Sequence, residues 1–133
     1  MILVDANVFM YAAGKPSPQR GPCQRFLRDV LAGLAGQVCT DAEVLQEVLH
    51  RYRSIGAADT GYRLFDAVLS LGIPILAVGE AEVAEARRLL AEHTALSTRD
   101  GVHLGVMRTN GVRSVLTYDR DFDAIPWVER REP

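Results

Sequence analysis

The sequence contains little lysine, little cysteine and no long apolar segment. Lys15 is the only lysine, so arginine carries nearly all of the positive charge, and the formal net charge is −2 over 133 residues. This balance argues against a strongly basic nucleic-acid-binding protein. The two cysteines, Cys23 and Cys39, show no metal-ligand spacing and are expected to be reduced thiols.

No stretch is apolar enough to predict a membrane span. The longest uncharged run, residues 67–79, contains Gly72 and Pro74 and falls well short of the ~20 residues that a span needs. The apolar start has no basic leader, and Asp5 interrupts it. We therefore expect a cytoplasmic protein with no membrane contact.

The composition predicts one globular domain over residues 1–133. With 48% hydrophobic and 24% charged residues, the chain can bury a core, and it shows no repeat or interdomain linker. Short apolar runs predict strands at 1–4, 36–40, 73–78, 114–118 and 127–130. Helical spacing predicts helices at 7–13, 23–35, 41–53, 59–71, 80–93 and 98–110. This alternation indicates an α/β fold, with a mostly parallel sheet of four to five short strands flanked by helices on both faces.

Carboxylates follow two of the predicted strands directly. Asp5 follows the first strand and Asp119 the strand at 114–118, while Asp100 begins the helix before that strand. Glu47 lies beside the apolar stripe of the helix at 41–53. Parallel α/β sheets place functional groups beyond the carboxyl ends of their strands. We therefore expect these four acids to face one crevice, where their oxygens suit a hard divalent cation.

Each polar residue also has a purely structural explanation. Asp5 and Asn7 could cap the helix that follows the first strand, and Asp119 could form a turn. Asp100 suits the first turn of its helix, and Glu47 could form an ion pair along its own helix. For each residue taken singly, the structural explanation is favoured. The functional interpretation is favoured only because the fold would bring these residues together.

The three aspartates of "DRDFDA" invite comparison with a calcium loop. Asp119, Asp121 and Asp123 match positions one, three and five of such a loop. Position six, which needs glycine, is Ala124, and position twelve, which needs glutamate, is Arg130. The calcium-loop interpretation is therefore rejected.

Other polar residues are assigned structural roles. In "TDAE" we expect Thr40 to cap the helix at 41–53 and Glu43 to reach back to it. The histidines His50, His93 and His103 show no paired metal spacing and are expected to be packed or surface residues.

Four segments together resemble one family. "MILVDANVFMY", "VCTDAEVLQEV", "STRDGVHLGVM" and "VLTYDRDF" resemble, in this order, the four acidic motifs of PIN-domain nucleases. The length and single-domain layout are similar to those of VapC-type ribonuclease toxins. The resemblance implies an acidic catalytic and metal site, with supporting polar positions and a second-tier acid. The implied residues are Asp5, Glu47, Asp100 and Asp119 as the acids, Asn7 and Thr117 as support, and Asp121 as the second-tier acid. The family often has alanine where this chain has Gly101.

The resemblance also implies a reaction and partners. Four carboxylates would hold Mg²⁺ or Mn²⁺, and a water of lowered pKa would cleave RNA phosphodiesters. Arginines at the rim would guide the RNA, with Arg20, Arg51, Arg99 and Arg120 as candidates. A small VapB-like antitoxin and a homodimer are implied for the toxins of this family.

Three alternatives stay open at this point. The first is a PIN nuclease of RNA processing that is not a toxin, and the second is a catalytically inactive PIN fold that only binds. The third is a receiver-like signalling domain phosphorylated on aspartate. That domain requires a lysine at the end of the last strand, and Lys15 lies in the first long loop.

Overall fold

The computed structural model describes all residues, 1–133, as a three-layer α/β domain. Five parallel strands form one sheet in the order β3-β2-β1-β4-β5. The strands are β1 (Ile2–Val4), β2 (Val38–Asp41), β3 (Ile75–Leu76), β4 (Ser114–Leu116) and β5 (Glu129–Arg131). The predicted fold class is confirmed, and every pair of neighbouring strands is parallel.

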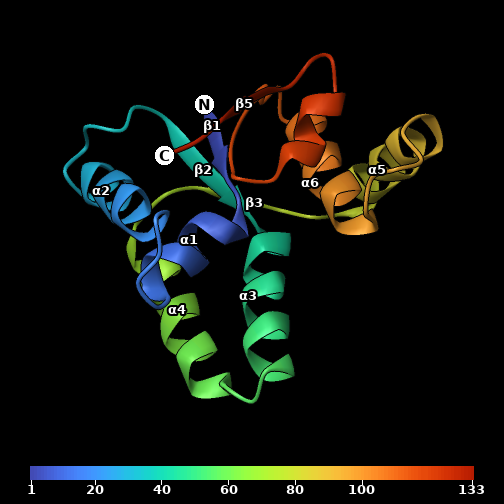
Figure 1. The fold of residues 1–133 in the computed structure, drawn as a ribbon. Coiled ribbons are helices and arrows are strands. Elements are labelled where there is room, and N and C mark those ends of the chain that lie inside the picture. Colours follow the sequence, from blue (N-terminus) through green and yellow to red (C-terminus); the bar gives the residue numbers. More distant parts are fainter.

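The helices divide between the two faces of the sheet. One face carries α1 (Ala6–Ala13), α2 (Arg20–Leu31), α3 (Ala42–Ser54) and α4 (Ala58–Ser70). The other face carries α5 (Glu80–Glu92), α6 (Thr98–Thr109) and the short 3₁₀ helix η1 (Arg120–Ala124). In Figure 1, α5 and α6 lie on one side of the strands and α1, α2 and α4 on the other.

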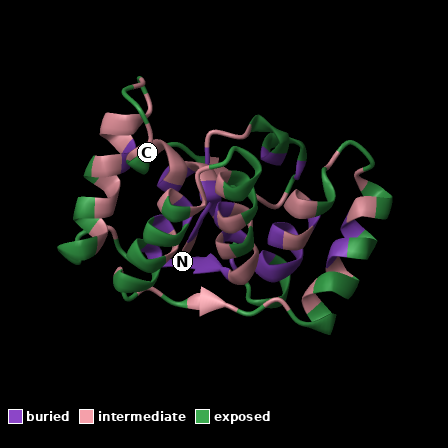
Figure 2. Ribbon diagram, turned by 90° about the horizontal axis from the view of Figure 1, so that it is seen from below, coloured by how far each residue is buried: buried purple, intermediate pink, exposed green.

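Successive side chains along each central strand belong alternately to two apolar cores, one on each face of the sheet. Leu3 and Val115 pack toward α5 and α6, while their neighbours Val4 and Leu116 pack toward α1 to α4. Successive strand side chains point to opposite faces, so a central strand with helices on both sides must be apolar throughout. The buried strands occupy the middle of the molecule and the exposed residues its periphery (Figure 2).

Two glycines let α5 and α6 approach closely. A Cβ on Gly105 would lie 2.3 Å from the backbone oxygen of Glu82, and one on Gly101 would lie 2.7 Å from Cγ of Leu90. At position 101, where the family often has alanine, the glycine therefore serves helix packing in this chain.

Two local predictions were wrong. Asp41, and not Thr40, caps α3. Its side chain accepts a hydrogen bond from the Val44 amide at 2.8 Å. Thr40 instead donates to the backbone oxygen of Val4 at 2.9 Å and so ties β2 to β1. Helix α2 begins at Arg20, before the predicted start, because a proline in the first turn removes only an amide that has no helical partner.

Candidate functional site

The sheet reverses its strand order between β1 and β4, and the candidate site lies there. The chain proceeds from β1 outward to β2 and β3, then returns to β4 on the other side of β1. The crevice of such a sheet opens at this switch point, beyond the carboxyl ends of the strands. Asp5 follows β1 and Asp119 lies three residues after β4, so both lie at this edge.

Asp5 is held by a network that includes both predicted supporting residues. Its Oδ1 accepts from the Ala6 amide at 2.7 Å, and its Oδ2 accepts from Thr117 Oγ1 at 2.6 Å and Asn7 Nδ2 at 3.0 Å. Thr117 Oγ1 also accepts from Asn7 Nδ2 at 2.8 Å and from the Asp119 amide at 3.0 Å. Asp5 therefore caps α1 and is fixed in orientation at the same time.

Burial raises the pKa of Asp5 to about 6, although the charge of His103 and the hydrogen bond from Thr117 favour its ionised form. The nearby charge of Glu47 adds to the rise. A buried carboxylate in this position is costly to keep ionised unless a positive charge lies close to it.

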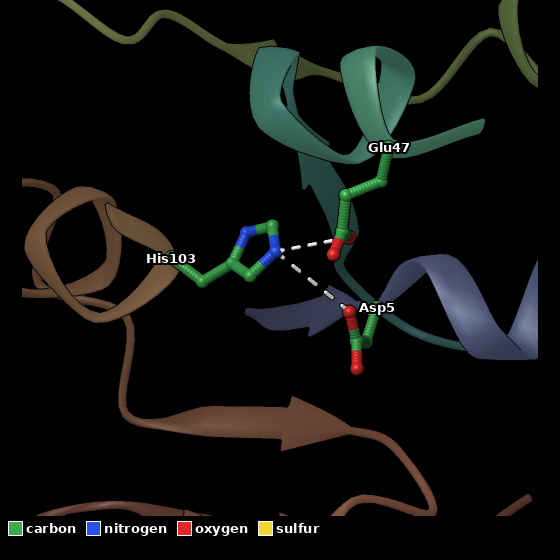
Figure 3. Close-up of side chains that lie close together, drawn as sticks. All are labelled: Asp5, Glu47 and His103. Atoms are coloured by element: carbon green, nitrogen blue, oxygen red, sulfur yellow. Dashed lines mark hydrogen bonds and ion pairs between the residues drawn. The ribbon is translucent and has the colours of Figure 1, made fainter. Parts of the chain in front are cut away.

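His103 is the residue on which Asp5 and Glu47 converge (Figure 3). Its ring is fully buried, and Nδ1 donates to Asp41 Oδ2 at 2.7 Å. Nε2 lies 3.2 Å from Glu47 Oε2 and 3.9 Å from Asp5 Oδ1. Burial alone would lower the pKa of His103, but the hydrogen bonds to Asp41 and Glu47 and the nearby negative charges raise it well above its ordinary value.

His103 and Asp41 were not predicted as site residues. The only sequence signal is that His103 lies three residues after Asp100 on α6, a spacing that puts both near one helix face. Its partner Asp41 lies 62 positions away, and no local pattern reports such a contact.

A second group of carboxylates lies at the open side of the crevice. Asp100, Asp119 and Asp121 each place an oxygen within 4.8 Å of the other two. With Glu47, Ser97 and Arg99 they line a pocket of about 560 Å³ that has no hydrophobic residue in its wall. Burial raises the pKa of Asp100, the hydrogen bond from Ser97 opposes this, and the charge of Asp119 adds to it.

The four predicted acids therefore occupy two adjoining groups. Asp5 and Glu47 lie with His103, whereas Asp100 and Asp119 lie with Asp121. Glu47 links the groups, because it contacts His103 and also lines the pocket.

Two further charges near the site form ion pairs. Arg99 pairs with Glu47 at 3.1 Å, which replaces the ion pair along α3 that we considered for Glu47. Asp123, the third acid of "DRDFDA", pairs with Arg130 at 2.7 Å and is not one of the acids that line the pocket.

Comparison with known proteins identifies the family. The PIN domain model matches residues 2–128. Ribonuclease VapC13 of Mycobacterium tuberculosis is 37% identical over 130 residues, which cover 98% of each chain. Ribonuclease VapC23 of the same species is 39% identical over 119 residues, covering 90% of this chain and 93% of the relative. This chain belongs to the PIN-domain family, in its VapC branch.

Solved structures share the PIN fold of this chain. VapC20 of Mycobacterium tuberculosis, a toxin that cleaves the sarcin-ricin loop, superposes with a TM-score of 0.79 at 21% identity and covers 97% of this chain and 98% of its own. The DNA-bound VapBC of Salmonella typhimurium superposes with a TM-score of 0.72 at 16% identity, covering 98% and 96%. The strand order of this PIN domain also differs from the 2-1-3-4-5 order of receiver-type domains, which removes that alternative.

No helix of this PIN domain is both long and apolar enough to cross a membrane.

Proposed function

We propose that this chain is a divalent-metal-dependent endoribonuclease that cleaves RNA phosphodiesters with an activated water, and that it is the toxin of a VapBC-type pair. The observation that carries the proposal is the convergence of acids from four elements on the carboxyl edge of the sheet. Its relatives at 37% and 39% identity are named ribonucleases, which supports RNA as the substrate.

The donor set fits Mg²⁺ or Mn²⁺. Asp100, Asp119 and Asp121 offer only carboxylate oxygens, and they line a polar pocket wide enough for an ion with its remaining waters. We assign the ion to the predicted acids Asp5, Glu47, Asp100 and Asp119, with Asp121 as an additional oxygen donor. Such an ion supplies a water of lowered pKa and positive charge for the phosphate oxygens.

The remaining residues bind and orient. Asn7 and Thr117 hold the Asp5 carboxylate, and His103 with Asp41 behind it holds Glu47. Arg99, at the pocket wall, offers a guanidinium that can exchange its Glu47 partner for a substrate phosphate. A rigid acid frame with a cation at its rim is suited to holding an RNA strand while water attacks.

A small antitoxin is the proposed protein partner. Several solved relatives are complexes of VapB and VapC proteins, including those from Salmonella typhimurium and Rickettsia felis. Expression of the chain alone should arrest bacterial growth, and co-expression of its cognate VapB-like antitoxin should restore it. Growth that continues without the partner would favour an RNA-processing nuclease over a toxin.

The predicted homodimer is tested separately by sedimentation equilibrium.

The deciding experiment measures cleavage of labelled RNA by the purified protein. We expect cleavage with Mg²⁺ or Mn²⁺, none with EDTA, and loss of most activity in Asp5→Asn. Asparagine keeps the volume of the side chain and one acceptor oxygen, so the far-UV circular dichroism should not change. Robust metal-independent cleavage, or an active Asp5→Asn protein, would contradict the proposal.

A further inference from the structure

A second groove shares no lining residue with the acidic pocket and has the opposite chemistry. It has a volume of about 620 Å³ and lies between α1, the loop after α1 and the second half of α3. Its wall includes Asn7, Tyr11, Lys15, Arg51, Tyr52 and Ile55. The wall contains two cations and two tyrosines, and no acid.

Helical spacing connects this groove to the catalytic acids. Arg51 lies four residues after Glu47 on α3, so the two share a helix face about 6 Å apart along the axis. On α1, Asn7 and Tyr11 have the same spacing, and Asn7 Nδ2 bonds Asp5 Oδ2 at 3.0 Å. The groove therefore begins at Asn7, which contacts Asp5, and lies one helical turn from Glu47.

Both cations of the groove are exposed and available. Arg51 would be the ordinary helical partner of Glu47, but Glu47 pairs with Arg99 and His103 instead. Lys15, the only lysine of the chain, lies in the loop after α1. Two exposed cations that form no ion pair and line one groove favour an anionic occupant that spans both.

The tyrosines are held in place. The Tyr11 ring packs edge-to-face against Tyr118, with centroids 5.4 Å apart. Tyr52 packs closely on α4, because a Cβ added to Gly61 would lie only 2.7 Å from the Cβ of Tyr52. Rings fixed in this way are suited to stack an unpaired base with little loss of side-chain freedom.

We propose that this groove binds one nucleotide of the RNA substrate beside the scissile phosphate, with its base against Tyr11 and Tyr52 and its phosphate at Arg51 and Lys15. The proposal rests on RNA being the substrate, as argued above. The combination of aromatic wall and cations matches a nucleotide, whereas a purely apolar peptide segment would leave both charges unpaired.

The first test measures binding without cleavage. The Asp119→Asn protein is titrated into a short fluorescent single-stranded RNA, and anisotropy is followed at several salt concentrations. Adding Arg51→Gln should raise Kd by roughly fivefold or more and flatten the salt dependence of log Kd by about 0.7, the value for one lost phosphate contact with a single strand. Arg53→Gln, an exposed arginine of the same helix outside the groove, should leave both values unchanged.

The second test asks whether a base occupies the groove. An abasic nucleotide is moved stepwise through the RNA, and each RNA is titrated with Asp119→Asn and with the double variant Asp119→Asn, Tyr11→Leu. At one position the abasic change should weaken binding of the Asp119→Asn protein by roughly tenfold and that of the double variant hardly at all, as expected for a shared stacking contact. Tyr11→Phe, which keeps the ring, should restore the effect, and melting curves confirm that each variant is folded.

The outcomes separate this proposal from the proposed function. If the native chain cleaves RNA but the Arg51 and Tyr11 variants bind it like the parent protein, the groove proposal is wrong and the nuclease assignment stands. If those variants instead weaken only the complex with the antitoxin, the groove is a protein-docking surface, and the proposal is again wrong. If RNA binding shows the expected losses while the chain does not cleave, the groove proposal stands and the nuclease assignment fails.

Discussion

His103 shows how one residue can join a structural and a chemical role. It holds Asp41 on one side of its ring and Glu47 on the other, at 2.7 and 3.2 Å. Asp41 is fully buried and also caps α3. A single side chain therefore links the start of α3 to the carboxylate of Glu47 further along it.

His103→Ala should destabilise the fold strongly. Removing the ring leaves the Asp41 carboxylate buried without its charge partner, a change that costs about 3–5 kcal/mol in buried ion pairs. Urea unfolding followed by circular dichroism measures the loss. The control is His50→Ala on the exposed side of α3, which should lie within about 0.5 kcal/mol of the native protein. Equal stabilities for the two variants would mean that the Asp41 contact contributes nothing.

The three aspartates of "DRDFDA" should differ in their effect on cleavage. Asp119→Asn should abolish cleavage. Of the three aspartates that line the acidic pocket, Asp119 is nearest in sequence to the end of β4. Asp121→Asn should only weaken cleavage. A carboxylate oxygen of Asp121 lies within 4.8 Å of oxygens of Asp100 and Asp119, but Asp121 is exposed. Asp123→Asn should barely change it, because Asp123 pairs with Arg130. Initial rates under identical metal concentrations measure the series, and equal losses would contradict this ranking.

At the scale of elements, the contact between α5 and α6 positions the third acidic segment. Asp100 lies in the first turn of α6, and the same helix carries His103. The helix is locked against α5 at two glycines, of which Gly105 makes the closer approach. The place of Asp100 and His103 in the site therefore depends on a packing contact that contains neither residue.

Gly105→Ala should lower the free energy of unfolding by about 1–3 kcal/mol, the range for overpacking a close contact. The added methyl would meet the backbone of α5, which cannot move without shifting the whole helix. Gly101→Ala should cost less, because its methyl would meet the Leu90 side chain, which can change rotamer. Thermal melts of both variants in EDTA rank them, and a more stable Gly105→Ala protein would contradict the packing argument.

At the scale of the whole molecule, the site concentrates negative charge at one edge of the sheet. His103 and Arg99 offset the charge of Asp5 and Glu47, but Asp100, Asp119 and Asp121 form none of the ion pairs present in the structure. Repulsion among these three acids opposes folding, and a cation that binds only the folded chain reverses it.

Asp100→Asn should therefore melt a few degrees higher than the native protein in EDTA while losing activity. Millimolar Mn²⁺ should raise the melting temperature of the native protein and have a much smaller effect on the variant. Differential scanning calorimetry of both proteins, with EDTA and with Mn²⁺, measures all four values. A variant that melts lower in EDTA and responds equally to Mn²⁺ would make Asp100 a structural residue of α6.

The sequence by itself determined the class of the fold and the edge at which acids gather. Strand and helix periods are local properties, so the short apolar runs and amphipathic helices could be recognised without knowing what they pack against. Asp5 and Asp119 could be placed for the same reason, because each comes shortly after a strand, and parallel strands share a carboxyl edge.

Only the tertiary structure decided which side chains meet. The contact between Asp41 and His103 joins residues 62 positions apart, and the bond between Thr117 and Asp5 joins residues 112 positions apart. Neither helical nor strand periodicity carries information over such sequence separations. The division of the acids into two groups depends on where α6 lies, because Asp100 joins Asp119 and Asp121 while His103 of the same helix joins Asp5 and Glu47. The place of α6 depends on packing, including the glycine contact between α5 and α6. Packing complementarity is a property of the assembled elements, and it is therefore invisible in any one segment.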